Sequence, residues 1–289
     1  MDFCERYESD PYPTRAFCSQ HRTVVWIASC QVDLDNYVLE QIPTLPCLQS
    51  LEPSFYPFYV CTAVRKFFFF LDPNKKGRIR IKSLITSSML NEFFDLRSEN
   101  LTEEEEKLNW FSALSALRIY GNYLSLDVDT NGMLTKSELM RYGSGTLTSV
   151  FVDRVFEECH TYDGEMDYKT FLDFAIAMEN KDTPQALQYF FRLLDIRRQG
   201  GLDKFTINYF FRAILSALRQ AGHEVVNVED VQDEIFDMAK PRDRTMITLQ
   251  DLIDCKVGGT IVSMLTDMVG FWQYDNREEL KLQDSDGPT

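Results

Sequence analysis

Apolar residues recur at spacings of three and four along most of the chain from Val32 onward, which is the pattern of helices with one buried face. In the stretch 55–70 this face carries Phe55, Phe58, Tyr59, Thr62, Lys66, Phe69 and Phe70. Pro57 falls in the first turn of the expected helix, where a missing amide N–H is tolerated. Few segments show the period-two alternation of a strand. The pattern therefore predicts a mainly α protein.

Short loops rich in Asp, Asn, Gly and Lys interrupt the helical pattern and divide it into four or five helix–loop–helix units. In each loop an aliphatic residue or Met follows the turn, at Ile79, Leu134, Met166, Leu202 and Ile247. Paired units of this kind exchange a short two-stranded contact at this position. Leu134 and Met166 are 32 residues apart, and Leu202 and Ile247 are 45 apart. The spacing predicts that the second unit pairs with the third and the fourth with the fifth, which leaves Ile79 without a partner.

The second loop, DVDTNGMLTKSE at 127–138, matches the calcium loop of an EF-hand at each diagnostic position, with Gly132 at the sixth. Its predicted metal ligands are Asp127, Asp129, Asn131, Met133 (through its backbone carbonyl) and Glu138. Thr135 would act directly or through a water molecule. Ca²⁺ takes about six to eight oxygen ligands, and Gly132 permits the sharp turn that wraps them around it. The oxygen-only set predicts calcium, with Mg²⁺ as a competitor.

This loop has two other interpretations. Asp and Asn residues often cap helices, and a helix is expected to begin near Thr135. Capping needs one such residue, however, and explains neither Gly132 nor Glu138. The string LDVDTN also resembles the first motif of haloacid-dehalogenase-type phosphatases, in which Asp127 would be a nucleophile after a strand and Asp129 the acid. Asn131 stands where that motif has Thr, and the preceding residues have helical spacing.

The remaining loops are degenerate versions of the same motif. The first, at 72–83, has Lys76 at the fifth position and Ser83 at the twelfth. The fourth has Arg197 at the third position and Thr206 at the twelfth, while the third and fifth lack a full ligand set. These units are expected to be structural. One intact loop among several degenerate ones favours a metal with a local stabilising or tuning role over a calmodulin-like switch.

The predicted division of the chain follows these units. The segments are 1–31, an N-terminal stretch without clear pattern; 32–115, helices with the first degenerate unit; 116–180, the pair with the intact loop; 181–280, the degenerate pair; and 281–289, an acidic tail.

Composition and charge exclude several functional classes. The 289 residues include 30 Lys and Arg against 45 Asp and Glu, a net charge of −15, which argues against nucleic acid as a partner. The longest apolar runs, at 24–28 and 67–71, are too short to span a bilayer, so no membrane partner is expected and the location is predicted to be cytoplasmic. The seven cysteines support neither a disulfide framework nor a zinc site.

Motifs of catalysis are also missing from the sequence. It has no phosphate-binding Gly-rich loop ending in Gly-Lys-Ser/Thr, no His-Glu-x-x-His and no Gly-x-Ser-x-Gly, so no catalytic residues are predicted. Four consecutive phenylalanines at 67–70 cannot all be buried by one helix face, and part of this surface is expected to meet another protein.

Several long aromatic-rich strings together resemble the gamma-type B'' (B-double-prime) regulatory subunits of protein phosphatase 2A, a family of EF-hand proteins. The strings, in order, are LEQIPTLPCL, SFYPFYVCTAVRKFFFFLDP, NWFSALSALRIYGNYLSLDVDTNGML, VFEECHTYDGEMDYKTFLDF, NYFFRAI, VQDEIFDMAKP and GFWQYDNRE. The resemblance covers about Val32 to Leu280. Residues 1–31 do not resemble the long N-terminal helical region of the family, which this chain is therefore expected to lack.

The resemblance implies a regulatory and targeting subunit without catalysis of its own. Its partners would be the scaffold and catalytic subunits of the phosphatase, and its role would be to direct substrate choice or location. The plant relatives act in microtubule organisation, so nuclear or cytoskeletal association is expected besides the cytoplasm. The alternative is a free-standing EF-hand calcium sensor or buffer, which depends only on the loop at 127–138 and the acidic charge.

Overall fold

The structure is a computed structural model that describes residues 28–98, 100–224 and 226–278. Its two strands are β1 (Ala28–Cys30) and β2 (Arg78–Arg80). Its α-helices are α1 (Gln31–Gln41), α2 (Tyr56–Leu71), α3 (Ile81–Ile85), α4 (Ser88–Asp95), α5 (Glu103–Leu108), α6 (Ala113–Leu126), α7 (Lys136–Leu139), α8 (Ser149–Glu158), α9 (Tyr168–Glu179), α10 (Pro184–Leu194), α11 (Lys204–Gln220), α12 (Val228–Ala239), α13 (Leu249–Asp254), α14 (Gly258–Thr266) and α15 (Met268–Asp275). Short 3₁₀ turns occupy Ile42–Thr44, Pro46–Leu48, Pro53–Phe55 and Tyr142–Gly145.

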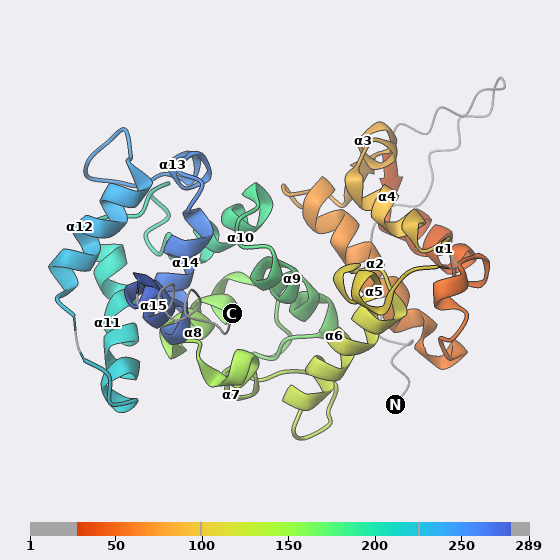
Figure 1. Ribbon diagram of the computed structural model, residues 1–289, viewed down its shortest axis with the longest axis horizontal. Helices are drawn as coiled ribbons and strands as arrows, with labels where there is room; N and C mark the ends of the chain where they lie inside the picture. The colour runs from red at the N-terminus through yellow and green to blue at the C-terminus, as the bar shows by residue number, and fades with distance from the viewer. Residues whose placement is uncertain (1–27, 99, 225, 279–289) are drawn as a thin grey trace, which may run out of the picture.

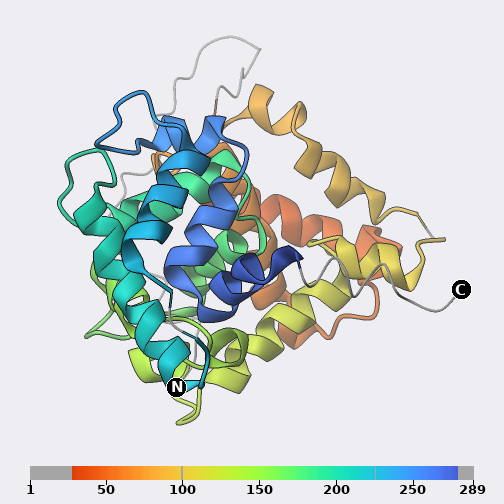
Figure 2. The same cartoon turned by 60° about the vertical axis from the view of Figure 1, so that its left-hand side comes forward.

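The helices form an elongated array, with α1–α5 at one end, α11–α15 at the other and α6–α10 between them (Figure 1). Figure 2, in which the C-terminal half comes forward, shows α11, α12 and α14 side by side, and each of the three contacts the other two. The prediction of a mainly α protein is confirmed. No described helix is both long and apolar enough to cross a membrane.

Most helices begin at a side chain that satisfies the free amide groups of the first turn. These N-cap residues are Ser87, Thr102, Ser112, Thr135, Thr148, Asp167, Thr183, Asp203, Asn227, Thr248 and Asp267. The acidic run that follows Thr102 forms the exposed first turn of α5, where negative charge is favourable for the helix dipole.

The predicted pairing of the loops is confirmed. Leu134 and Met166 form an antiparallel bridge through two N–H···O bonds of 2.8 Å. Leu202 and Ile247 form the equivalent bridge, with bonds of 2.8 and 3.0 Å. All four side chains are fully buried. The second unit therefore pairs with the third, and the fourth with the fifth.

The prediction that Ile79 has no partner is wrong. Strand β2 pairs with β1 in antiparallel register, and Ile79 lies opposite Ser29. Helix α1 starts directly after β1, and the Cys30 amide donates to Asp33 Oδ2 at 3.0 Å. A short strand followed at once by a helix is the second half of a helix–loop–helix unit. The sequence hid this strand because three residues are too few to show an alternation.

Helix α2 is central to the N-terminal half and contacts α1, α6 and α9. Phe67 and Phe68 are buried, and Phe67 lies against Phe111 with 5.0 Å between ring centroids. Phe69 and Phe70 are half-buried and also pack against the core. Neighbouring helices therefore cover α2 from more than one side, and the expectation that part of this surface meets another protein stays a prediction.

Three polar contacts fix α2 among its neighbours. Tyr59 Oη donates to the Phe111 carbonyl at 2.8 Å, Trp110 Nε1 donates to the Thr62 carbonyl at 3.1 Å, and the Thr62 and Tyr168 hydroxyls lie 2.8 Å apart. Buried polar groups that are paired in this way specify one arrangement of the helices.

We expect the replacement Asp35→Asn to raise the melting temperature at pH 7 and to leave it unchanged below about pH 4. Burial raises the pKa of the Asp35 carboxyl on α1 to about 6, although Lys169, Gln31 and Arg65 act in the opposite direction. Because the pKa is higher in the folded chain than in the unfolded one, the stability contribution of Asp35 is complete at low pH and is lost as the pH rises through 6. Thermal unfolding between about pH 3.5 and 8 measures this, and a difference that does not vary with pH contradicts it.

The predicted division into segments stays a prediction. The acidic tail at 281–289 and most of the segment 1–31 lie outside the described residues.

Candidate metal centre

The loop at 127–138 connects α6 to α7 and is shaped by its own backbone. Gly132 has φ +80°, a conformation that suits glycine, and Thr130 is also left-handed at φ +56°. The Gly132 amide donates to Asp127 Oδ2 at 2.9 Å, and the Asn131 amide donates to Asp127 Oδ1 at 3.1 Å. These bonds fix the first predicted ligand at the point where α6 ends.

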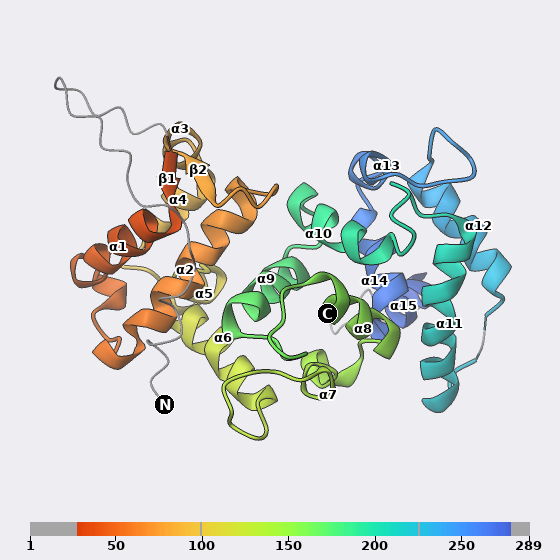
Figure 3. The same cartoon turned by 180° about the vertical axis from the view of Figure 1, so that it is seen from behind.

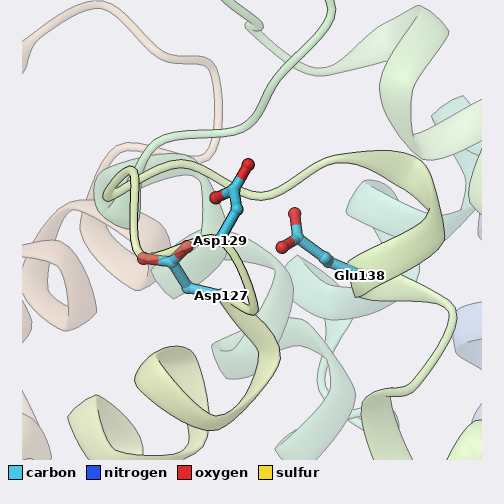
Figure 4. Close-up of side chains that lie close together, drawn as sticks. All are labelled: Asp127, Asp129 and Glu138. Carbon is cyan, nitrogen blue, oxygen red and sulfur yellow. The ribbon is translucent and has the colours of Figure 1, made fainter.

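Three carboxylates converge inside this loop. Oxygens of Asp127, Asp129 and Glu138 lie within 4.8 Å of one another, and Figure 4 shows the three side chains directed toward a common space. Asp127 and Glu138 are buried, whereas Asp129 is exposed. Three negative charges at this separation repel one another unless a cation lies between them.

Glu138 is held in position from both sides of the loop. Its Oε1 accepts from the Val128 amide at 2.8 Å, while its Oε2 accepts from the Thr135 amide and hydroxyl, both at 2.8 Å. Burial raises the pKa of the Glu138 carboxyl, but the bonds from Thr135, Val128 and Asp129 outweigh this and leave the pKa below its usual value. The carboxylate is therefore ionised at neutral pH, as a ligand for a cation must be.

The other two predicted ligands have different surroundings. Asn131 Nδ2 donates to Asp129 Oδ2 at 3.1 Å, while Asn131 Oδ1 accepts from the Met133 amide at 2.7 Å. The Asn131 amide group must therefore turn before its oxygen can face the carboxylates. Met133 was predicted to act through its backbone carbonyl, and it lies in the same turn. The structure thus brings together three of the five predicted ligands.

The donor set fits a hard divalent cation. All three converging groups are carboxylates, which suit Ca²⁺ or Mg²⁺ and not metals that prefer sulfur or nitrogen ligands. Within the described residues, none of the three forms an ion pair with Lys, Arg or His, so no protein cation neutralises them. In the same part of the chain, no second group of three Asp, Glu, His or Cys side chains converges in this way.

Two anchors of the loop could not be predicted from the motif. Tyr123 Oη donates to the Gly132 carbonyl at 2.7 Å, which ties the loop to α6. Arg141, just after α7, donates from Nη2 to the Ser125 and Leu126 carbonyls at 2.8 and 2.6 Å, and so satisfies the end of α6. Neither residue belongs to the twelve positions 127–138, so the motif gives no signal for either.

The two rival interpretations of the loop are wrong. Helix α7 is capped by Thr135, so Asp127, Asp129 and Asn131 are not its caps. Asp127 follows the helix α6 and not a strand, which excludes the phosphatase motif of the haloacid-dehalogenase type.

The first and fourth loops repeat the turn without the ligands. Asp72 Oδ2 accepts from the Gly77 amide at 2.6 Å, and Asp195 Oδ2 accepts from the Gly200 amide at 2.7 Å. These bonds join the first and sixth positions, as in the loop at 127–138. Neither loop has an acid at its twelfth position.

The third and fifth loops are contracted. Tyr162 bridges Glu165 and Asp243 bridges Met246, so each loop closes as a tight hairpin. Asp167, one of the acids of the third loop, caps α9.

Similar proteins were found among curated sequences and solved structures, whereas no protein-family model matches the chain. The chain is 59% identical over 256 residues, 89% of its length, to the gamma member of the B'' regulatory subunits of serine/threonine-protein phosphatase 2A from Xenopus tropicalis. It is 58% identical over 254 residues, 88% of its length, to the protein of the same name from Homo sapiens. The chain spans only 57% and 56% of the lengths of these two relatives.

One solved structure has the same fold. It is a chain of a PP2A PR70 holoenzyme in a diCa (two-calcium) form. The match has a TM-score of 0.77 at 24% sequence identity and covers 87% of this chain and 94% of that one. The matched chain therefore extends the likeness from sequence to the arrangement of the helices.

Proposed function

The chain is a homologue of the gamma-type B'' regulatory subunits of serine/threonine-protein phosphatase 2A, and we propose that it is itself a regulatory subunit of such a phosphatase, without catalytic activity of its own. The observation that carries this proposal is the identity of 58% and 59% over nearly nine tenths of the chain. Its partners would be the scaffold and catalytic subunits, and its role would be to direct substrate choice or location. A cytoplasmic location, with nuclear or cytoskeletal association, is part of the proposal.

The loop at 127–138 is proposed to bind Ca²⁺ within this role. Asp127, Asp129 and Glu138 would supply carboxylate oxygens, joined by the side-chain oxygen of Asn131 and the carbonyl of Met133. Two observations support this. Three carboxylates converge within the turn, and the PR70 holoenzyme of the same fold is a diCa (two-calcium) form. A bound cation would offset the repulsion between the carboxylates and so stabilise the junction of α6 and α7.

The proposed function is tested by co-purification. The tagged chain is mixed with purified scaffold and catalytic subunits, once in calcium and once in chelator, beside the variant Glu138→Gln. Capture in both conditions indicates a constitutive subunit in which the ion has a structural role. Capture that is lost in chelator and in the variant indicates assembly regulated by calcium. Absence of capture in every condition contradicts the proposal for this chain.

A free-standing calcium sensor is the second candidate, and it makes a different prediction. A sensor exposes apolar surface when it binds calcium, so the fluorescence of a hydrophobic dye would rise on adding calcium without any phosphatase subunit. The four degenerate loops favour the regulatory role, because sensors of this class use paired sites.

A further inference from the structure

The first degenerate loop concentrates positive charge in an acidic protein. From 73 to 91 the sequence contains five basic residues and no acidic one, although acidic residues outnumber basic ones by 45 to 30 in the whole chain. All five are exposed. Together they form the basic strip, which consists of Lys75, Lys76, Arg78, Arg80 and Lys82.

The backbone of β2 sets the spacing of two members of the strip. Arg78 and Arg80 lie on β2 at alternate positions, and Ile79 between them is fully buried. Alternate side chains of a strand point to one face and are about 7 Å apart along it. Lys76 precedes the strand and Lys82 follows it on α3, so the charges continue beyond both of its ends. Figure 3 shows β2 and α3 at the edge of the array, beside β1.

Most of the strip has no partner of opposite charge in the part of the chain that the structure describes. Lys75 forms an ion pair with Asp173 at 3.5 Å, but among the described residues Lys76, Arg78, Arg80 and Lys82 form none.

The basic residues of the fourth loop contrast with this. Arg197 pairs with Asp203 at 3.0 Å, and Arg198 pairs with Glu158 at 3.0 Å. The cations of a degenerate loop can therefore be paired, whereas in the first loop only Lys75 has an ion-pair partner among the described residues.

The charge of the first loop is the reverse of that of the metal loop. The segment 127–138 has three acidic residues and one basic residue, whereas 72–83 has one acidic residue and five basic ones. The single acid, Asp72, is buried and accepts the Gly77 amide, so it maintains the turn. The first loop thus has the same kind of turn as the metal loop, but its exposed side chains are cationic.

We propose that the basic strip is a docking surface for an acidic, extended segment of a partner protein. In an extended peptide, side chains that share a face are also about 7 Å apart, which matches the spacing of Arg78 and Arg80. Guanidinium groups bind carboxylates through paired hydrogen bonds, which gives such a contact both strength and direction.

The net charge of the chain favours a short acidic segment over a larger polyanion as the partner. The chain has a net charge of −15, so the surface outside the strip repels a nucleic-acid duplex or an anionic membrane, which would extend beyond the strip. A short acidic segment contacts the strip alone and avoids that repulsion.

The test uses the full chain and a fluorescein-labelled peptide of about twelve residues in which Glu and Ser alternate. Fluorescence anisotropy measures its affinity for wild type, for Arg78→Gln with Arg80→Gln, and for Lys240→Gln with Arg244→Gln. The last pair removes the same charge from exposed positions of the fifth loop. We expect the first pair to weaken binding about tenfold or more, the second to change it less than about twofold, and added salt to weaken it in wild type.

Several results would overturn the proposal. The first is that wild type does not bind the peptide, and the second is that both double variants lose the same amount of peptide affinity. The third is that a DNA duplex or phosphatidylserine vesicles bind more tightly than the peptide and that this binding depends on Arg78 and Arg80. Lys76→Gln with Lys82→Gln, which leaves β2 intact, is the second test if the strand variant unfolds, and it should also weaken binding. The assay contains no phosphatase subunit, so its outcome is independent of the proposed function.

Discussion

Replacement of Glu138 by Gln is expected to lower the calcium affinity of the loop at least about a hundredfold. The change removes one negative charge and one oxygen from the ligand set. It also places an amide N–H₂ where the carboxylate now accepts from Val128 or from Thr135, so a donor would face a donor. Isothermal titration calorimetry on chelator-treated protein measures the affinity directly.

The matched control for this variant is Asp251→Asn. Asp251 accepts from the Thr248 amide at 2.9 Å and hydroxyl at 2.6 Å, which is the same capping box that Glu138 forms with Thr135, and both carboxylates are buried. No acidic cluster surrounds Asp251 in the described chain. Its loss should therefore weaken the start of α13 without changing calcium binding. Wild-type affinity in Glu138→Gln would show that the ion binds elsewhere, and equal losses in both variants would point to unfolding.

The second large effect concerns stability. We expect Asp173→Ala to lower the free energy of unfolding by about 3–5 kcal/mol, because it leaves the largely buried guanidinium of Arg65 without its anion. Asp173 on α9 is 6% exposed, and its Oδ1 accepts from Arg65 Nε at 3.1 Å and from Nη2 at 2.5 Å. Burial alone would lower the pKa of the Arg65 guanidinium, but Asp173 raises it above its usual value. Urea unfolding measures the difference.

Arg118→Ala provides the comparison, because Arg118 pairs with Glu179 at 2.9 Å on the surface. An exposed pair of this kind contributes about 0.2–1 kcal/mol. Arg65 lies on α2 and Asp173 on α9. If Asp173→Ala costs no more than Arg118→Ala, this pair does not contribute more to stability than an exposed one. The double variant Arg65→Met with Asp173→Leu should recover much of the loss, because no unpaired charge remains.

The sequence was informative where the signal is local. A twelve-residue motif places its own ligands, so the convergence of Asp127, Asp129 and Glu138 could be anticipated from spacing. The bridge between Leu134 and Met166 could be anticipated too, because each follows its turn at the same offset. The roles of Tyr123 and Arg141 depend on how α6 and α7 meet in space, which no spacing along the chain encodes.

One fold prediction failed, namely that Ile79 has no partner. Residues 28–30 form a strand because β2 is beside them, and three residues carry too little pattern of their own. The four phenylalanines at 67–70 are divided among several sides of α2, with Phe67 and Phe68 buried and Phe69 and Phe70 half-buried. The periodicity of a helix shows which of its faces are apolar, but not how many neighbouring helices pack against those faces.

In three different loops a hydrogen bond joins the first position to the sixth. This bond fixes the shape of the turn whether or not the loop has the ligands for a metal ion. Asp72, Asp127 and Asp195 each accept from a glycine five residues later, whatever the remaining side chains are. Metal binding can thus be gained or lost in this architecture by a few substitutions at the ligand positions while the backbone keeps its course. The ligand residues of one loop can therefore be exchanged, in evolution or by design, without changing the fold of the other loops.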